Sequence, residues 1–98
     1  MNKLFVVIVR YIVDLPEIEI HLKAHCKFLD DNYKSGIFIV SGPQVPRSGG
    51  IILAKCESRK LLEQILSKDS FAIHRLAEYQ IYEFTAAGYV PEFKAILQ

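Results

Sequence analysis

A continuous run of β-branched and aromatic residues near the N-terminus, KLFVVIVRY (Lys3–Tyr11), constrains the fold more than any other feature. The run is too short for a buried helix and does not alternate with polar residues, so it predicts a strand buried on both faces and central in its sheet. Arg10 interrupts it far short of the roughly 20 apolar residues that span a membrane. Because a signal-peptide cleavage site is also missing, we expect a cytoplasmic protein with no membrane contact.

A helical pattern follows this strand. Asp14 and Pro16 are start signals, and Gly36 is a stop signal. Between them, spacings of four, three, four and four place one stripe of side chains on a single helix face: Ile18, Leu22, His25, Leu29 and Tyr33. The stripe predicts one amphipathic helix that packs on the sheet.

Two further strands are expected at Ile37–Gly42 and Gly49–Cys56. The segment between them, PQVPRSGG, is rich in turn residues and cannot continue either strand. Such a short link favours an antiparallel hairpin.

A second helix and a last strand complete the pattern. Ser58 is the candidate cap of the helix, which ends near Lys68 and Asp69. The last strand, Ala77–Phe84, alternates inward and outward side chains, which predicts one covered face. The inward face of the helix is expected to consist of Leu61, Leu62, Ile65 and Leu66, and that of the strand to include Tyr79 and Ile81.

The order of elements is β-α-β-β-α-β, which predicts an α+β ferredoxin-like fold with a four-stranded antiparallel sheet and two helices on one face. The 98 residues suit a single domain over residues 1–98. Residues 85–98 form an apolar tail that we expect to pack on this sheet or on a partner. With 51% hydrophobic residues, the chain is expected to form a homodimer or a larger assembly of itself.

Charge and motif content narrow the classes of function. Twelve Lys and Arg residues face eleven Asp and Glu residues and are scattered, so no nucleic-acid partner is expected. Cys26 and Cys56 are expected to be reduced thiols, and no Cys and His spacing indicates a metal site. Dinucleotide and P-loop glycine patterns are missing as well, so we expect no cofactor.

His25 stands at the centre of the stripe of the first helix, where its ring points at the sheet. A buried imidazole without a hydrogen-bond partner costs about 1–3 kcal/mol, so the fold or a ligand must supply one. Two interpretations stay open: a core histidine bonded to a carbonyl or a tyrosine, or a site residue. Asp69 either caps the next turn or reaches a neighbouring cation, and the two helices share one sheet face. A His25–Asp69 pair is therefore a hypothesis.

The loop between the second and third strands offers candidate binding residues. Ser41, Gly42 and Pro43 stand at a strand end, and Arg47 follows among turn residues. A guanidinium there can hold a substrate carboxylate, although a solvated arginine has the same pattern. His21 lacks a third ligand for a metal site with His25, and His74 precedes the last strand, where it is either rim or site.

Several short motifs, in this order along the chain, resemble the YciI-like (YCII-related) family up to about Phe84: AHCKFL, SGIFIVSGP, GGIILAKCES, LLEQILSKDSF and AEYQIYEF. The resemblance implies a dimeric α/β barrel, in which two ferredoxin-like domains pack their sheets face to face. It also implies a His–Asp site at His25 and Asp69, beside the Ser41-Gly42-Pro43 turn. One departure is visible, since Ser70 replaces the proline that usually follows the aspartate, so the rigid turn is lost.

The resemblance and the residues together lead to a hypothesis of function. Asp69 would orient His25 and stabilise its protonated form, giving a general acid–base without a cofactor. Its substrate would be a small aromatic or lactone-like carbonyl compound, with Arg47 or Ser41 at an anionic end. The family is similar in fold to muconolactone isomerases, small dehalogenating enzymes and cofactor-free monooxygenases. The alternatives are a non-catalytic dimeric module that binds a small hydrophobic metabolite, and a plain dimerisation domain.

Overall fold

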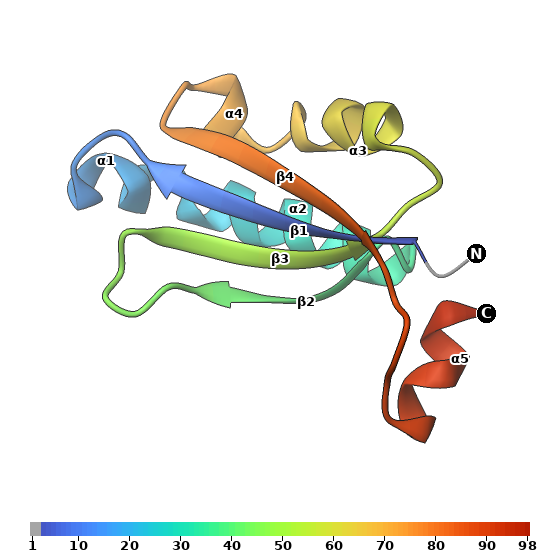
Figure 1. Ribbon diagram of the computed structural model, residues 1–98. Helices are drawn as coiled ribbons and strands as arrows, with labels where there is room; N and C mark the ends of the chain where they lie inside the picture. The colour runs from blue at the N-terminus through green and yellow to red at the C-terminus, as the bar shows by residue number, and fades with distance from the viewer. Residues whose placement is uncertain (1–2) are drawn as a thin grey trace.

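The computed structural model describes residues 3–98, so residues 1–2 of the expected domain lie outside the described part of the chain. Four antiparallel strands form one sheet in the order β2-β3-β1-β4, and helices α1 to α4 lie on one side of it (Figure 1). The fold is therefore the expected α+β ferredoxin-like fold. Within residues 3–98, no helix has both the length and the apolar character needed to cross a membrane.

The strands are β1 (Lys3–Tyr11), β2 (Phe38–Pro43), β3 (Gly49–Lys55) and β4 (Ala77–Thr85). The helices are α1 (Leu15–Ile20), α2 (Leu22–Lys34), α3 (Arg59–Leu66), α4 (Ser70–Ile73), the 3₁₀ helix η1 (Pro91–Phe93) and α5 (Lys94–Leu97).

Strand β1 pairs with β3 on one side and β4 on the other, so its predicted central position is confirmed. Phe5, Val7 and Val9 point toward the helices and are almost fully buried. Val6 and Ile8 point to the opposite face and are only half-buried. Burial on both faces is therefore wrong for the single chain, because the helices cover only one side of the sheet.

The single helix expected between Asp14 and Gly36 is wrong, because the structure divides it at His21 into α1 and α2. The His21 carbonyl accepts a hydrogen bond from the backbone N–H of His25 at 3.1 Å and a second from Ser70 Oγ, also at 3.1 Å. Helices commonly bend where an outside side chain engages their hydrogen-bond ladder. The break thus lies where α4 is tied to the first helical segment.

The second helical segment follows its predicted start. Ser58 caps α3 by accepting a hydrogen bond from the backbone N–H of Leu61. Leu62 and Leu66 are buried, but Leu61 is 38% exposed, so its predicted inward position is wrong. The helix ends at Leu66, and the short helix α4 begins after Asp69.

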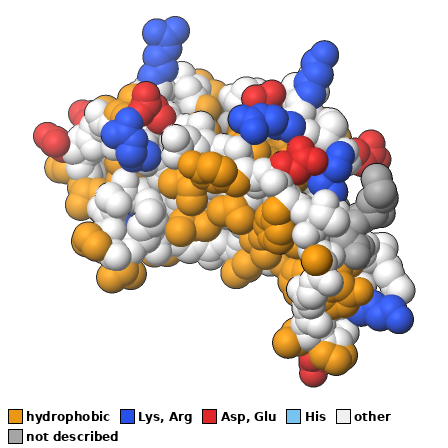
Figure 2. Space-filling model, in the orientation of Figure 1, with side chains coloured by type: hydrophobic (Ala, Val, Ile, Leu, Met, Phe, Trp, Pro, Cys, Tyr) orange, Lys and Arg blue, Asp and Glu red, His pale blue; other side chains and the backbone are white. Residues whose placement is uncertain are grey.

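The face of the sheet away from the helices, here called the open face, is largely apolar and only partly covered. Figure 2 shows hydrophobic side chains gathered in the middle of this face, with charged side chains toward its margins. The large apolar side chains that the open face exposes include Val40, Ile51, Tyr82 and Phe84. This face is unusual for an isolated chain, because contiguous exposed apolar surface commonly marks an interaction site.

The C-terminal tail covers one end of the open face. Leu97 and Ala86 are buried against Leu4, with Ile39, Leu53 and Phe93 partly buried around them. Lys55 Nζ donates hydrogen bonds to the carbonyl oxygens of Ile96 and Gln98, at 2.7 and 2.9 Å. The tail therefore packs on its own sheet, one of the two expected positions.

Candidate active site

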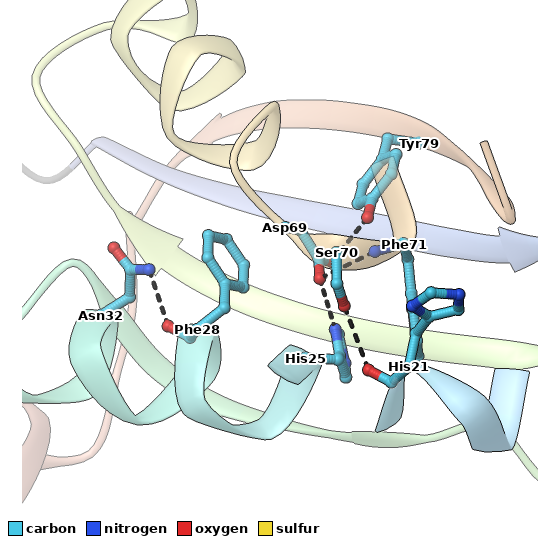
Figure 3. Close-up of polar contacts among 8 residues, drawn as sticks. All are labelled: His21, His25, Phe28, Asn32, Asp69, Ser70, Phe71 and Tyr79. Carbon is cyan, nitrogen blue, oxygen red and sulfur yellow. Dashed lines mark hydrogen bonds and ion pairs between the residues drawn. The ribbon is translucent and has the colours of Figure 1, made fainter. Parts of the chain in front are cut away.

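His25 and Asp69 come together between the helices and the sheet. His25 lies on α2, and Asp69 lies between α3 and α4; the distance from His25 Nδ1 to Asp69 Oδ1 is 2.8 Å (Figure 3). The Asp69 side chain is fully buried, and the His25 side chain is 14% exposed. Asp69 Oδ1 also accepts from the backbone N–H of Phe71 at 3.3 Å. Asp69 therefore caps the start of α4 and also reaches the imidazole of His25.

Tyr79 is a third member of this cluster and was not among the candidate site residues. Its hydroxyl, on β4, donates to Asp69 Oδ2 at 2.5 Å. Burial raises the pKa of Tyr79, and the nearby negative charge of Asp69 and their hydrogen bond raise it further. The phenol therefore stays protonated and remains a donor throughout the ordinary pH range. The sequence held the signal, because the alternation in the last strand placed the Tyr79 hydroxyl on the covered face, where it needs an acceptor.

The contacts of His25 also define which of its ring nitrogens is free. Its ring stacks on Phe71, with centroids 3.9 Å apart and planes within 8° of parallel. Because the Asp69 carboxylate is an acceptor, His25 Nδ1 is the donor in their hydrogen bond. Among residues 3–98, every buried side-chain nitrogen has a hydrogen-bond partner, whereas His25 Nε2 has none. Nε2 therefore reaches accessible space.

A cavity of about 310 Å³ lies beside His25, and most of the candidate residues line it. His25, Ser41, Gly42, Pro43 and Arg47 all line it, whereas Asp69 is buried behind the imidazole. The rest of the wall is mainly apolar and includes Val9, Leu22, Leu29, Ile51, Ile52 and Phe71. An apolar cavity with a few convergent polar groups is the usual form of a small-molecule site.

The polar groups at the rim of the cavity already have partners. The Ser41 hydroxyl is hydrogen-bonded to the hydroxyl of Tyr33, a residue of α2. Arg47 Nη1 donates to Glu19 Oε1 at 3.0 Å. Arg47 is thus not a freely solvated side chain, and its partner Glu19 does not line the cavity.

The other histidines and the cysteines lie around the site with different roles. His21 and His74 stack on each other, with ring centroids 4.0 Å apart, and neither lines the cavity. Over the described residues, no three His, Cys, Asp or Glu side chains are grouped to hold a metal ion. Cys26 is exposed and lines the cavity, while Cys56 is buried. Cys26 therefore offers a chemical reporter of what occupies the cavity.

Ser70, the residue after Asp69, is tied to the first helical segment. It is buried, and its hydroxyl donates to the His21 carbonyl, so the start of α4 is held against the break between α1 and α2 (Figure 3). Although serine replaces the proline that the family usually has here, the Asp69 carboxylate points toward His25.

Comparison with known proteins gives a family match and several similar solved structures, including the following two. A family model for the YCII-related domain matches residues 4–85. A 5-chloro-2-hydroxyhydroquinone dehydrochlorinase from Burkholderia phenoliruptrix, in complex with 2,5-dihydroxybenzoquinone, superimposes with a TM-score of 0.71 at 16% identity, covering 84% of this chain and 93% of its own. The cofactor-independent oxygenase SnoaB from Streptomyces nogalater gives a TM-score of 0.51 at 15% identity, covering 93% and 99%. A comparison with curated proteins gave no match.

Tyr79→Phe should destabilise the fold, because it removes one of the hydrogen bonds that hold a buried carboxylate. We expect a loss of about 1–3 kcal/mol in the free energy of unfolding, measured by urea denaturation. Tyr89→Phe is the matched control, since the Tyr89 side chain is 46% exposed and follows the end of β4. Equal, negligible effects of the two substitutions would show that the Tyr79 bond does not support Asp69.

Proposed function

Because the chain belongs to the YCII-related family and has the ferredoxin-like fold of the dimeric α/β barrel superfamily, we propose that it is a small-molecule enzyme that uses His25 as a general acid–base. One observation carries the proposal: His25 bonds a buried carboxylate through Nδ1 and has Nε2 free beside an apolar cavity. This is the arrangement that a proton-transfer catalyst needs, with one nitrogen to orient the ring and the other to meet the substrate.

The mechanism follows from the two nitrogens. With the proton on Nδ1, the lone pair of Nε2 accepts a proton from a bound substrate. The resulting imidazolium lies 2.8 Å from the Asp69 carboxylate, which stabilises its charge. Asp69 is itself fixed by Tyr79 and by the backbone N–H of Phe71, so little reorganisation is needed during the transfer. His25 then returns the proton to another atom of the substrate or to a leaving group.

The cavity limits the size and character of the substrate. Its volume of about 310 Å³ is at the lower end of the range for ligand sites, roughly 300–1,000 Å³, which suits a compound of one ring. Apolar walls favour an aromatic or lactone-like ring, and an acidic proton next to a carbonyl is the proton that an imidazole can remove. The structural neighbour that is a dehydrochlorinase, solved in complex with 2,5-dihydroxybenzoquinone, supports a reaction on a small ring compound. The neighbour that is a cofactor-independent oxygenase supports a reaction without a cofactor.

A non-catalytic binding module is the second candidate, because most of the cavity wall is apolar and would hold a hydrophobic metabolite without reacting with it. The two candidates differ in what they require of His25. An enzyme needs its Nε2 for turnover, whereas a binding module needs only the shape of the cavity.

We also propose that two copies of the chain pack through their open faces. The open face joins exposed Val40, Ile51, Tyr82 and Phe84 to the half-buried Val6 and Ile8. Covering such a surface with a second copy removes apolar area from water. Ile51 belongs both to the open face and to the cavity wall, so the second copy would lie next to one side of the cavity. The resemblance to the YCII-related family implies dimers that pack sheet to sheet, which supports this arrangement.

His25→Asn should slow turnover strongly and leave binding nearly unchanged. Substrate candidates are hydroxyquinones and small lactones, followed by absorbance, with binding read from protection of Cys26 against alkylation. We expect the rate to fall by about 10²–10⁴-fold, the usual contribution of a general acid–base. His74→Asn is the matched control, because His74 is exposed and outside the cavity. Ligands that protect Cys26 in both proteins but are turned over by neither would favour the binding module and contradict the enzyme.

Val6→Lys should convert the proposed dimer to a monomer, because it places a charge in the middle of the open face. Sedimentation equilibrium should give twice the mass of one chain for the natural sequence and the mass of one chain for the variant. Ile73→Lys is the control, since Ile73 is 61% exposed on α4, on the helix side. A natural protein that sediments as a monomer would contradict the dimer.

A further inference from the structure

Arg47 is held at the rim of the cavity by a braced loop. The loop that joins β2 to β3 bonds to the end of β1 and closes on itself, through Tyr11 N–H to Ser48 O at 3.0 Å and Gln44 N–H to Gly49 O at 2.8 Å. Gly49 lies so close to β1 that an added Cβ would be 1.8 Å from the Val9 carbonyl oxygen. These contacts fix the backbone next to Arg47, and the Arg47 side chain lines the cavity.

Glu19 holds that guanidinium from outside the cavity. Glu19 is on α1, three residues before Leu22, which lines the cavity. The hydrogen bond that Arg47 donates to Glu19 is the largest cause that raises the pKa of Arg47, and a hydrogen bond with Tyr11 adds to it, so the guanidinium stays charged. The Glu19 side chain is 53% exposed, and the pair is a single contact of 3.0 Å between Arg47 Nη1 and one carboxylate oxygen.

We propose that the cavity selects an anionic ring compound, a carboxylate or an enolate, and that Glu19 is a specificity-determining residue that yields Arg47 to this anion. The inference deepens the proposed function, on which it rests, by assigning the charge of the substrate. Arg47 would receive the anionic end of the ligand, while the ring lies along the apolar wall toward His25.

The strengths of the two competing contacts favour the exchange. A guanidinium has five N–H donors in a planar fork, and Glu19 is bonded to only one nitrogen, so donors remain for a bidentate ligand. The Glu19 contact is partly exposed to water, which weakens it, whereas a ligand in the apolar cavity meets Arg47 in a medium of lower polarity. A neutral ligand of the same shape would leave the Arg47–Glu19 pair intact and gain nothing from it.

Salicylate and salicylamide test the proposal, because they share one ring and differ in charge at neutral pH. Dissociation constants are measured by calorimetry and by protection of Cys26 from alkylation. In the natural protein we expect salicylate to bind about tenfold more tightly than salicylamide. Glu19→Gln should tighten salicylate binding by roughly threefold or more and leave salicylamide unchanged. Arg47→Gln should bring the two affinities together.

Two control variants separate charge selection from general effects. Glu17→Gln removes a neighbouring acidic residue of α1, and Arg10→Gln removes an arginine that pairs with Glu78 outside the cavity; neither should change the ratio of affinities. Equal binding of the two compounds by the natural protein would overturn the proposed charge selection but not the proposed role of His25. Weaker salicylate binding in Glu19→Gln would show that Glu19 positions Arg47 instead of competing for it. If neither compound protects Cys26, the cavity does not accept a single ring, and the proposed function falls as well.

Discussion

The buried carboxylate of Asp69 is the constraint on which the rest of the structure depends. A carboxylate away from water is costly unless hydrogen-bond donors surround it, and here three donors do so: His25 Nδ1, the backbone N–H of Phe71 and the Tyr79 hydroxyl. These donors belong to α2, α4 and β4. One side chain thus joins both helical segments to an edge strand of the sheet, and the same bonds that satisfy it orient the imidazole.

The proposed reaction and the proposed dimer use mainly different faces of the sheet. The helix side contains the core and the cavity, with His25 at its wall and Arg47 at its rim. The open side has exposed apolar side chains and the docked tail. Among the residues named for the two proposals, the cavity wall and the open face share Ile51, whereas His25 belongs only to the cavity and Val6 only to the open face, so substitutions at these two positions test the proposals separately.

Much of the fold followed from local patterns, and most of what was missed depended on contacts between distant residues. Strand β1 and the cap at Ser58 follow from residue types and spacing. Five of the residues that line the cavity were candidates from the sequence, namely His25, Ser41, Gly42, Pro43 and Arg47, whereas the rest of its wall was not predicted. The break at His21 could not be predicted, because it accompanies a hydrogen bond from Ser70, 49 residues later. Pairing of Arg47 with Glu19 joins residues 28 apart, and no local pattern indicates it. Tyr79 stands between these cases, since the strand pattern placed its hydroxyl inward but did not name Asp69 as the acceptor.

The contact of 2.8 Å between His25 Nδ1 and the Asp69 carboxylate places the proton of the neutral ring on Nδ1 and leaves Nε2 without one. Nitrogen-15 NMR correlation of the imidazole, at a pH where the ring is neutral, measures this tautomer. We predict a protonated Nδ1 and an unprotonated Nε2 in the natural protein, with this preference lost in Asp69→Ala. If His25 of the natural protein carries its proton on Nε2, its assignment as the general acid–base is wrong.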